Sequence, residues 1–166
     1  MPVFLSQHRE FLGTAEITSN AASFTVSGLP ERRYLMVAYR IAGLSAVGIP
    51  RLQFNSDTGN NYGSVRSDDS GGTTKTPTVA GILLLEGTAT LEQFGWLEIC
   101  NISNRRKSII FRSHSLSAVA TGSGDMTDGR GNWNNTVDQI TSITLDGNGV
   151  NIVAPAEIVV WGADLK

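Results

Sequence analysis

The triplet Asp57-Thr58-Gly59 is the part of this 166-residue chain whose residue types point most directly to chemistry, because aspartic proteases use the same triplet. In those enzymes two such carboxylates share a proton and activate water, which requires that each Asp enter a buried site from an apolar strand. Here polar residues flank the triplet, with Asn-Ser before it and Asn-Asn after it. This setting favours a turn in which Asp57 accepts a hydrogen bond from its own backbone and Gly59 takes a positive φ angle. We therefore predict a structural turn, with an aspartic-type hydrolase as the alternative.

Carboxylates in polar segments could gather around a hard cation, since Ca²⁺ takes about six to eight oxygen ligands. The candidates are Asp57, Asp68, Asp69, Asp125 and Asp128. Their spacing fits no calcium loop, because a twelve-residue loop counted from Asn55 places Arg66 where the bidentate Glu belongs. The histidines, His8 and His114, have no Cys or acid at ligand spacing, which argues against a zinc site and against a base-activated nucleophile. We therefore predict no catalytic residue, no metal and no cofactor.

Two segments could instead contact a partner. The basic cluster Arg105-Arg106-Lys107 could touch phosphate, although charges in a hairpin turn also keep the turn solvated. Trp133 follows the Gly-rich segment 121–131, where an aromatic ring could anchor a subunit interface or stack on a sugar, and an interface or local packing is the favoured interpretation. Trp96 and Trp161 lie in apolar strand patterns and are expected in the core. The predicted partner-contact residues are Asp57, Asn60, Tyr62, Arg105, Arg106, Lys107 and Trp133.

Composition limits the classes of partner. Charged residues make up 17% of the chain, below the roughly 25% of an average soluble domain, and the chain has 18 Gly. A net charge of −2 gives no overall attraction to nucleic acid or to anionic lipid, so neither is an expected partner. No stretch approaches the ~18 apolar residues of a membrane span, and the start Met-Pro-Val-Phe-Leu lacks a signal-peptide pattern, so we expect assembly in the cytosol. The single Cys100 leaves no intrachain disulfide.

Alternating apolar residues separated by turn signals predict an all-β chain, an antiparallel β-sandwich of jelly-roll type with long polar loops. We expect one domain over residues 1–166, with residues 33–41 as a central strand and residues 56–76 as a long exposed loop. Hairpins are expected between 10–18 and 22–28 and between 93–102 and 108–114. The remaining expected strands are 52–55, 79–86, 139–145 and 157–163.

Four segments in order resemble a group of tailed-bacteriophage virion proteins: Arg33 to Tyr39, Leu52 to Tyr62, Trp133 with Ile140 to Leu145, and Ile158 to Gly162. In that group a strand ending in a Phe-Asn-Gly-Asp-like turn and a Tyr, together with a closing strand that ends in an aromatic-Gly pair, frames a jelly-roll sandwich. This chain differs by having Ser56 where Gly is typical and Ala154-Pro155-Ala156 where a Gly-Ser turn is typical.

The resemblance implies a non-enzymatic virion structural protein whose partners are capsid or other virion proteins. Its leading form is a capsid cement or decoration protein acting as a small homo-oligomer such as a trimer, with the polar loops 56–76 and 121–132 reaching neighbouring subunits. The alternative is a tail-tip or tail-fibre module that binds host-surface carbohydrate.

Overall fold

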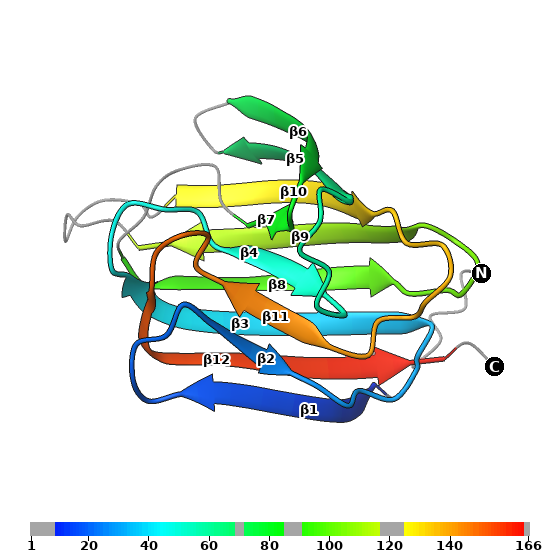
Figure 1. Ribbon diagram of the computed structural model, residues 1–166. Helices are drawn as coiled ribbons and strands as arrows, with labels where there is room; N and C mark the ends of the chain where they lie inside the picture. Colours follow the sequence, from blue (N-terminus) through cyan, green and yellow to red (C-terminus); the bar gives the residue numbers. More distant parts are fainter. Residues whose placement is uncertain (1–8, 69–71, 85–90, 117–124, 165–166) are drawn as a thin grey trace, which may run out of the picture.

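The computed structural model describes residues 9–68, 72–84, 91–116 and 125–164, and the regular elements in these ranges are all β-strands (Figure 1). The all-β prediction is therefore confirmed. In chain order the strands are β1 (Glu10–Ile17), β2 (Ser23–Val26), β3 (Tyr34–Leu44), β4 (Arg51–Phe54), β5 (Tyr62–Asp68), β6 (Thr73–Val79), β7 (Ile82–Leu83), β8 (Gln93–Cys100), β9 (Lys107–Ser115), β10 (Asp125–Trp133), β11 (Ile143–Asp146) and β12 (Ile152–Ala163).

The strands form two sheets of unequal width. The large sheet has eight strands in the order β1-β12-β3-β8-β9-β10-β5-β6, and the small sheet has four in the order β2-β11-β4-β7. Neighbouring strands pair antiparallel in both sheets. Figure 1 shows the small sheet in front of the large one, with β5 and β6 above it. The antiparallel β-sandwich is thus confirmed, and its jelly-roll type stays a prediction.

The core fills the space between the facing sides of the two sheets. Alternate residues of each strand point inward, as the period of two along a strand requires. Leu52 and Phe54 of β4 are fully buried, as are Val37 and Ile41 of β3. Full burial of one such side chain contributes about 1.5–3 kcal/mol, so the shared core is the main source of stability.

The central-strand prediction for residues 33–41 is confirmed, because β3 pairs with β12 on one side and with β8 on the other. The hairpin between 93–102 and 108–114 is also confirmed as β8 and β9, which pair from Cys100 and Ser108 to Gln93 and Ser115.

The predicted hairpin between 10–18 and 22–28 is wrong. β1 pairs with β12 in the large sheet, whereas β2 pairs with β11 in the small sheet. The connection crosses from one sheet to the other, so the two strands face each other through the core. A Cβ atom at Gly13 would lie 3.1 Å from Val26 Cγ1, which shows how closely the Val26 side chain packs against the backbone of β1. Both strands are amphipathic, and that pattern fits face-to-face packing as well as a hairpin.

The long loop predicted for residues 56–76 is also wrong, because most of it forms the β5–β6 hairpin. β5 pairs along its length with β10, so the Gly-rich segment that was expected to be a loop is a strand from Asp125 onward. Residues 117–124 lie outside the described residues. Backbone pairing needs no apolar side chains, and β5 carries the buried polar residues Ser64 and Arg66 on its inward side. Polar strands of this kind look like loops in a sequence.

The last two predicted strands are displaced in their bounds. The strand expected over 139–145 is the shorter β11, since residues 139–142 bond to the turn after β4 instead. The strand expected over 157–163 begins earlier, at Ile152. Pro155 lies within it at a register shift between Val153 and Ala156, where the ladder does not require a backbone donor.

A first prediction tests the pairing of β9 with β10. Phe111 lies across Gly129, and a Cβ atom there would be 2.0 Å from Phe111 Cζ. We expect Gly129→Ala to lower the free energy of unfolding in urea by about 1–3 kcal/mol because of this overlap. The double variant with Phe111→Leu should lose less than the sum of the two single variants. Arg130→Ala, on the exposed side of the same strand, should stay within about 0.5 kcal/mol. An unperturbed Gly129→Ala would mean that β10 does not pair this way.

Candidate interaction surface

The turn after β4 is built around two residues in the left-handed region, Asn55 with φ 51° and Ser56 with φ 58°. The Asp57 amide donates to the Phe54 carbonyl over 2.9 Å and closes the turn. Gly59, expected to take the positive φ, is not among the residues that do, so that part of the prediction is wrong. The left-handed geometry falls instead on Ser56, the position where the resembling virion proteins carry Gly.

Asp57 is a structural acceptor, as predicted. Its Oδ1 accepts the Gly59 amide at 2.9 Å and the Asn61 side-chain amide at 3.2 Å, while its Oδ2 accepts Trp133 Nε1 at 2.7 Å. Burial raises the pKa of Asp57, but the hydrogen bonds from Trp133, Gly59 and Asn61 outweigh it and hold the pKa below its ordinary value. Among the described residues these partners are N–H donors, so the carboxylate does not have the proton-sharing partner that an aspartic protease needs.

Tyr62 and Trp133 lie in the core beside this turn, each only 1% exposed. Their rings stack with centroids 6.2 Å apart and an angle of 15° between the planes, and Phe54 packs against both. The Tyr62 hydroxyl accepts the Phe54 amide at 2.9 Å and donates to the Asp57 carbonyl at 3.0 Å. The contact with a partner predicted for Tyr62 and Trp133 is therefore corrected to local packing, the alternative left open for Trp133, since both rings attach the turn to the core.

The basic cluster is divided between surface and interior. Arg105 and Arg106 are exposed, as is Asn60, but Lys107 is fully buried. Lys107 points inward like Ile109 along β9, and its Nζ donates to the carbonyls of Ile102, Arg105 and Asn135 over 2.9–3.2 Å. Desolvation lowers the pKa of Lys107. The predicted surface role of Lys107 is thus corrected to that of a cation that closes the β8–β9 turn.

Trp96 and Trp161 were expected in the core, and the structure places both on the outer side of the large sheet. Trp96 is 39% exposed and Trp161 is partly buried. They belong to an uncovered array that we call the apolar face. Its members are Phe11, Met36, Phe94, Trp96, Ile110, Met126, Val159 and Trp161. Alternation along β8 puts Trp96 on the side of Phe94 and Glu98, opposite Leu97 and Ile99, but it does not tell which of the two sides a second layer covers.

The strand register aligns the apolar face into rows across the sheet. Phe11 pairs with Trp161, Trp161 with Met36, and Met36 with Glu98, which in turn pairs with Ile110. Phe11, Phe94 and Ile110 are 58%, 49% and 57% exposed. Large apolar side chains gathered in this way mark an interaction site more often than an ordinary surface.

The charges on this face pair with one another. Arg9 lies 3.3 Å from Glu98, Arg40 lies 2.6 Å from Glu92, and Arg112 donates to Asp128 at 3.0 Å. The Arg112 guanidinium also lies over the Trp96 ring at 5.7 Å. Each of these acids neutralises an arginine of the same chain, whereas Glu16 and Glu157, which lie opposite each other on the outer side of β1 and β12, are exposed.

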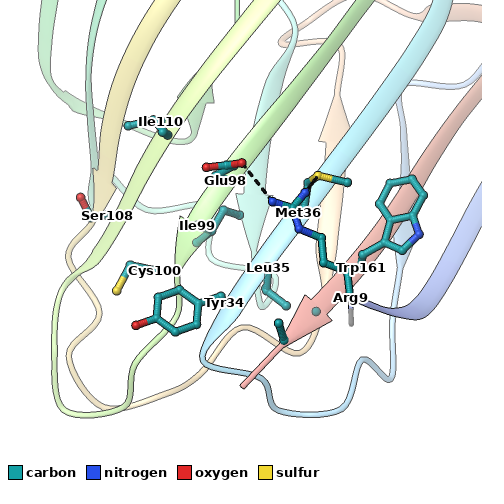
Figure 2. Close-up of a pocket in the computed structure, with 12 residues that line it drawn as sticks. Arg9, Tyr34, Leu35, Met36, Glu98, Ile99, Cys100, Ser108, Ile110 and Trp161 are labelled. Carbon is teal, nitrogen blue, oxygen red and sulfur yellow. Dashed lines mark hydrogen bonds and ion pairs between the residues drawn. The ribbon is translucent and has the colours of Figure 1, made fainter. Parts of the chain in front are cut away.

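A hollow of about 580 Å³ is set into the apolar face across β3, β8 and β12. Figure 2 shows Arg9 lying over it between Met36 and Trp161, and reaching Glu98. Arg9 also contacts the Met36 sulfur. The opposite outer side, on the small sheet, is mostly polar, with a Thr25–Thr144 hydrogen bond of 2.8 Å and an Arg51–Asp146 ion pair of 2.7 Å. The apolar face of the large sheet is therefore the best candidate for a contact with another molecule.

Among the described residues, no group of three His, Cys, Asp or Glu side chains could hold a metal ion. No helix long and apolar enough to cross a membrane occurs in that part of the chain.

Comparison with known proteins gives distant likenesses only. No protein-family model and no curated protein matches the chain. Among solved structures, the Clostridium perfringens CspB protease is similar at 9% identity and a TM-score of 0.29, over 96% of this chain and 26% of that one. The CBM2 module of the evolved Dit of Lactobacillus casei BL23 phage J-1 is similar at 7% identity and a TM-score of 0.27, over 92% of this chain and 69% of that one. The chain thus spans about a quarter of the length of the CspB protease, and at these TM-scores neither likeness identifies a fold family.

A second prediction concerns Asp57. Asp57→Asn leaves one acceptor oxygen for donors that now use two, so we expect the free energy of unfolding at neutral pH to fall by about 1–3 kcal/mol. Because the folded pKa of Asp57 is lowered, its stabilisation is present above about pH 4 and is lost as the pH falls through the folded value. The difference between wild type and variant in urea denaturation should therefore shrink in acid. Asn60→Ala, an exposed change in the same turn, should have little effect, and an equal loss there would refute the special role of Asp57.

A third prediction separates Lys107 from its neighbour. Lys107→Met leaves buried carbonyls without their donor and should lower the free energy of unfolding by about 1–3 kcal/mol. Arg106→Gln removes the same charge at the surface and should change it by less than about 0.5 kcal/mol. Thermal or urea denaturation of the two variants checks this, and equal stabilities would show that Lys107 is not held as described.

Proposed function

We propose that this chain is a non-enzymatic structural protein of a tailed-phage particle, and that it assembles as a homo-oligomer by burying the apolar face. The observation that carries the proposal is the set of exposed apolar residues on the outer side of the large sheet, among them Phe11, Phe94 and Ile110. The resemblance of four sequence segments to virion proteins supports the phage assignment. Phe54, Tyr62 and Trp133 from those segments pack together in the core, so the resembling residues are ones that stabilise the sandwich.

A second copy of this chain is the occupant that the apolar face suits best. Interfaces between permanent partners are more apolar than transient ones, and most soluble oligomers are built from identical subunits. The arginines of the face are already paired with acids of the same chain, as in Arg40–Glu92 and Arg112–Asp128. With its arginines already paired, the apolar face does not need an acidic partner and can meet a second copy of itself.

Within the particle, the leading role is that of a capsid cement or decoration protein, made in the host cytoplasm and retained on the virion. Such a protein gains affinity from many weak contacts to a repeating shell. The β5–β6 hairpin extends the large sheet beyond β10 and offers an arm for such contacts, while Asn60, Arg105 and Arg106 supply exposed polar groups elsewhere.

A tail module that binds host-surface carbohydrate is the second candidate, because exposed aromatic rings can stack on sugars. Tyr62 and Trp133 are buried and unsuited to this, but Phe94 and Trp96 are exposed, with ring centroids 6.3 Å apart. Their planes are tilted by 46°, and the Arg112 guanidinium already lies over Trp96. This arrangement is a poor flat platform, and it favours the cement role over sugar binding.

A fourth prediction tests the oligomer. The wild-type protein should sediment as an oligomer in analytical ultracentrifugation, with a mass that distinguishes a dimer from a trimer. Ile110→Glu places a charge in the middle of the apolar face and should shift the protein to monomer with its β-sheet circular dichroism unchanged. Thr25→Glu introduces the same charge on the small sheet and should leave the oligomer intact. A wild-type monomer at high concentration, or equal dissociation by both variants, would refute this interface.

A fifth prediction separates the two roles on the particle. Purified protein should co-sediment with empty heads, and Trp96→Ala should leave adsorption to whole host cells unchanged. Binding to cell-surface glycan that Trp96→Ala abolishes, together with no binding to heads, would favour the tail module.

In the same preparations a peptide library should stay intact, and hydrolysis by wild type but not by Asp57→Asn would restore the hydrolase alternative.

A further inference from the structure

A second hollow lies on the outer side of the large sheet at its other end, where β9, β10, β5 and β6 run side by side (Figure 1). Its volume is about 590 Å³. Three cationic side chains line it, Lys75 from β6, Arg130 from β10 and Arg106 from the β8–β9 turn. Ser108 and Asn132 add a neutral hydroxyl and an amide group to the lining.

Among the described residues these three cations make no ion pair with an acid, as is also true of the exposed Arg33 and Arg105, whereas five other arginines do. Ion pairs join Arg9, Arg32, Arg40, Arg51 and Arg112 to carboxylates of the described residues. Lys75, Arg106 and Arg130 make no such pair within the part of the chain that the structure describes, and the lining there includes no acid. Within the described residues, three positive charges around one hollow are thus left without an acid beside them, although the chain as a whole has a net charge of −2.

The strand register explains why these side chains share one space. Lys75 pairs with Val65, and Val65 pairs with Arg130, so the two cations flank Val65 on the same side of three neighbouring strands. Strands lie about 4.8 Å apart, which puts the two backbones about 10 Å from each other. The long side chains of Lys75 and Arg130 can span this distance and converge over Val65. Arg106 approaches from the end where Ser108 pairs with Asn132.

We propose that this hollow binds a phosphate monoester on a hydroxyl-rich carrier, that is, a phosphorylated sugar. A monoester carries about −1.5 to −2 charges at neutral pH, which suits several cations better than a singly charged carboxylate does. The guanidinium groups of Arg106 and Arg130 provide the forked donors that match phosphate oxygens, and Lys75 adds a point charge. The neutral side chains of Ser108 and Asn132 can bond the hydroxyls of the carrier, whereas the Thr76 hydroxyl accepts a hydrogen bond from Arg66 on the inner side.

Nucleic acid fits the same hollow less well. Single-stranded binders combine basic grooves with aromatic side chains on which bases stack, and duplex binders carry a basic stripe along the phosphate backbone. The lining in the described residues has no aromatic side chain, and its cations surround one compact space. The proposal does not depend on the apolar face, since no member of that face lines this hollow.

The test is a titration of the full-length protein followed by two-dimensional amide NMR at low ionic strength. The ligands are glucose 6-phosphate, glucose, inorganic phosphate and a DNA oligonucleotide. Glucose 6-phosphate should shift the amide resonances around Ser64, Lys75 and Arg130, and it should bind more tightly than inorganic phosphate. Its binding should weaken with added salt, because salt shortens the screening length. Glucose should cause no shift at the same concentration.

Matched variants identify the residues involved. Arg130→Gln and Lys75→Gln should each lower the affinity for glucose 6-phosphate about fivefold, which is the effect expected for the loss of one exposed charge contact. Arg105→Gln removes the same charge next to Arg106 but outside the lining, and should leave the affinity unchanged. All three positions are exposed, so the melting temperature should match that of the wild type and exclude misfolding as the cause.

No binding of glucose 6-phosphate, or equal weakening by Arg105→Gln, would overturn the site. Equal affinity for inorganic phosphate would overturn the sugar carrier, and tighter binding of DNA through the same residues would replace it with nucleic acid.

Discussion

A four-stranded sheet cannot cover both sides of an eight-stranded one, and this mismatch governs the rest of the molecule. On the inner side, the small sheet buries the apolar residues of β3, β8 and β12, such as Val37, Leu97 and Val160. Toward β10 and β5 the inward residues become polar, as Thr127 and Ser64 show, and Tyr39 donates to Ser113 at 3.0 Å where the two kinds of residue meet. On the outer side nothing from the described residues covers the large sheet, which leaves the apolar face exposed.

The Asp57 turn holds the two sheets together at one end. Phe54 ends β4 of the small sheet, whereas Tyr62 and Trp133 belong to β5 and β10 of the large sheet. One carboxylate and one hydroxyl therefore connect three strands across the sandwich, with the Trp133–Asp57 bond at 2.7 Å and the Tyr62–Phe54 bond at 2.9 Å. Asn55 extends the joint by accepting the amides of Thr141 and Ser142. The Asp57-Thr58-Gly59 triplet, which resembles a catalytic motif, is thus a structural link between the sheets, since its carboxylate accepts hydrogen bonds from Trp133 and from its own turn.

The sequence predicted the strands whose side chains alternate between apolar and polar, because burial on one side imposes that period on residues such as Leu52 and Phe54. It failed for β5, β6 and β10, where the backbone ladder and polar contacts replace apolar burial. The run Thr73 to Thr78 did contain a signal, since four β-branched threonines favour a strand. Residue type also misplaced Trp96 and Lys107, because alternation along a strand does not tell which of its two sides the other sheet covers. The basic hollow could not be foreseen, since β6, β10 and a turn supply its cations from distant parts of the chain.

The apolar face and the basic hollow adjoin on one surface, which constrains how they can be used together. Ile110 pairs with Arg130, and Arg130 with Val65, so a single row of the large sheet passes from one to the other. An oligomer contact centred on β3 and β12 would cover Met36 and Trp161 and leave the β5–β6 end open to solvent, because four strands separate β12 from β5. A contact that reached Arg130 would instead bring the cations of two subunits together, and their repulsion would oppose it unless an anion lay between them. The same charges that suit the hollow to phosphate therefore limit how far the subunit contact can extend across the sheet.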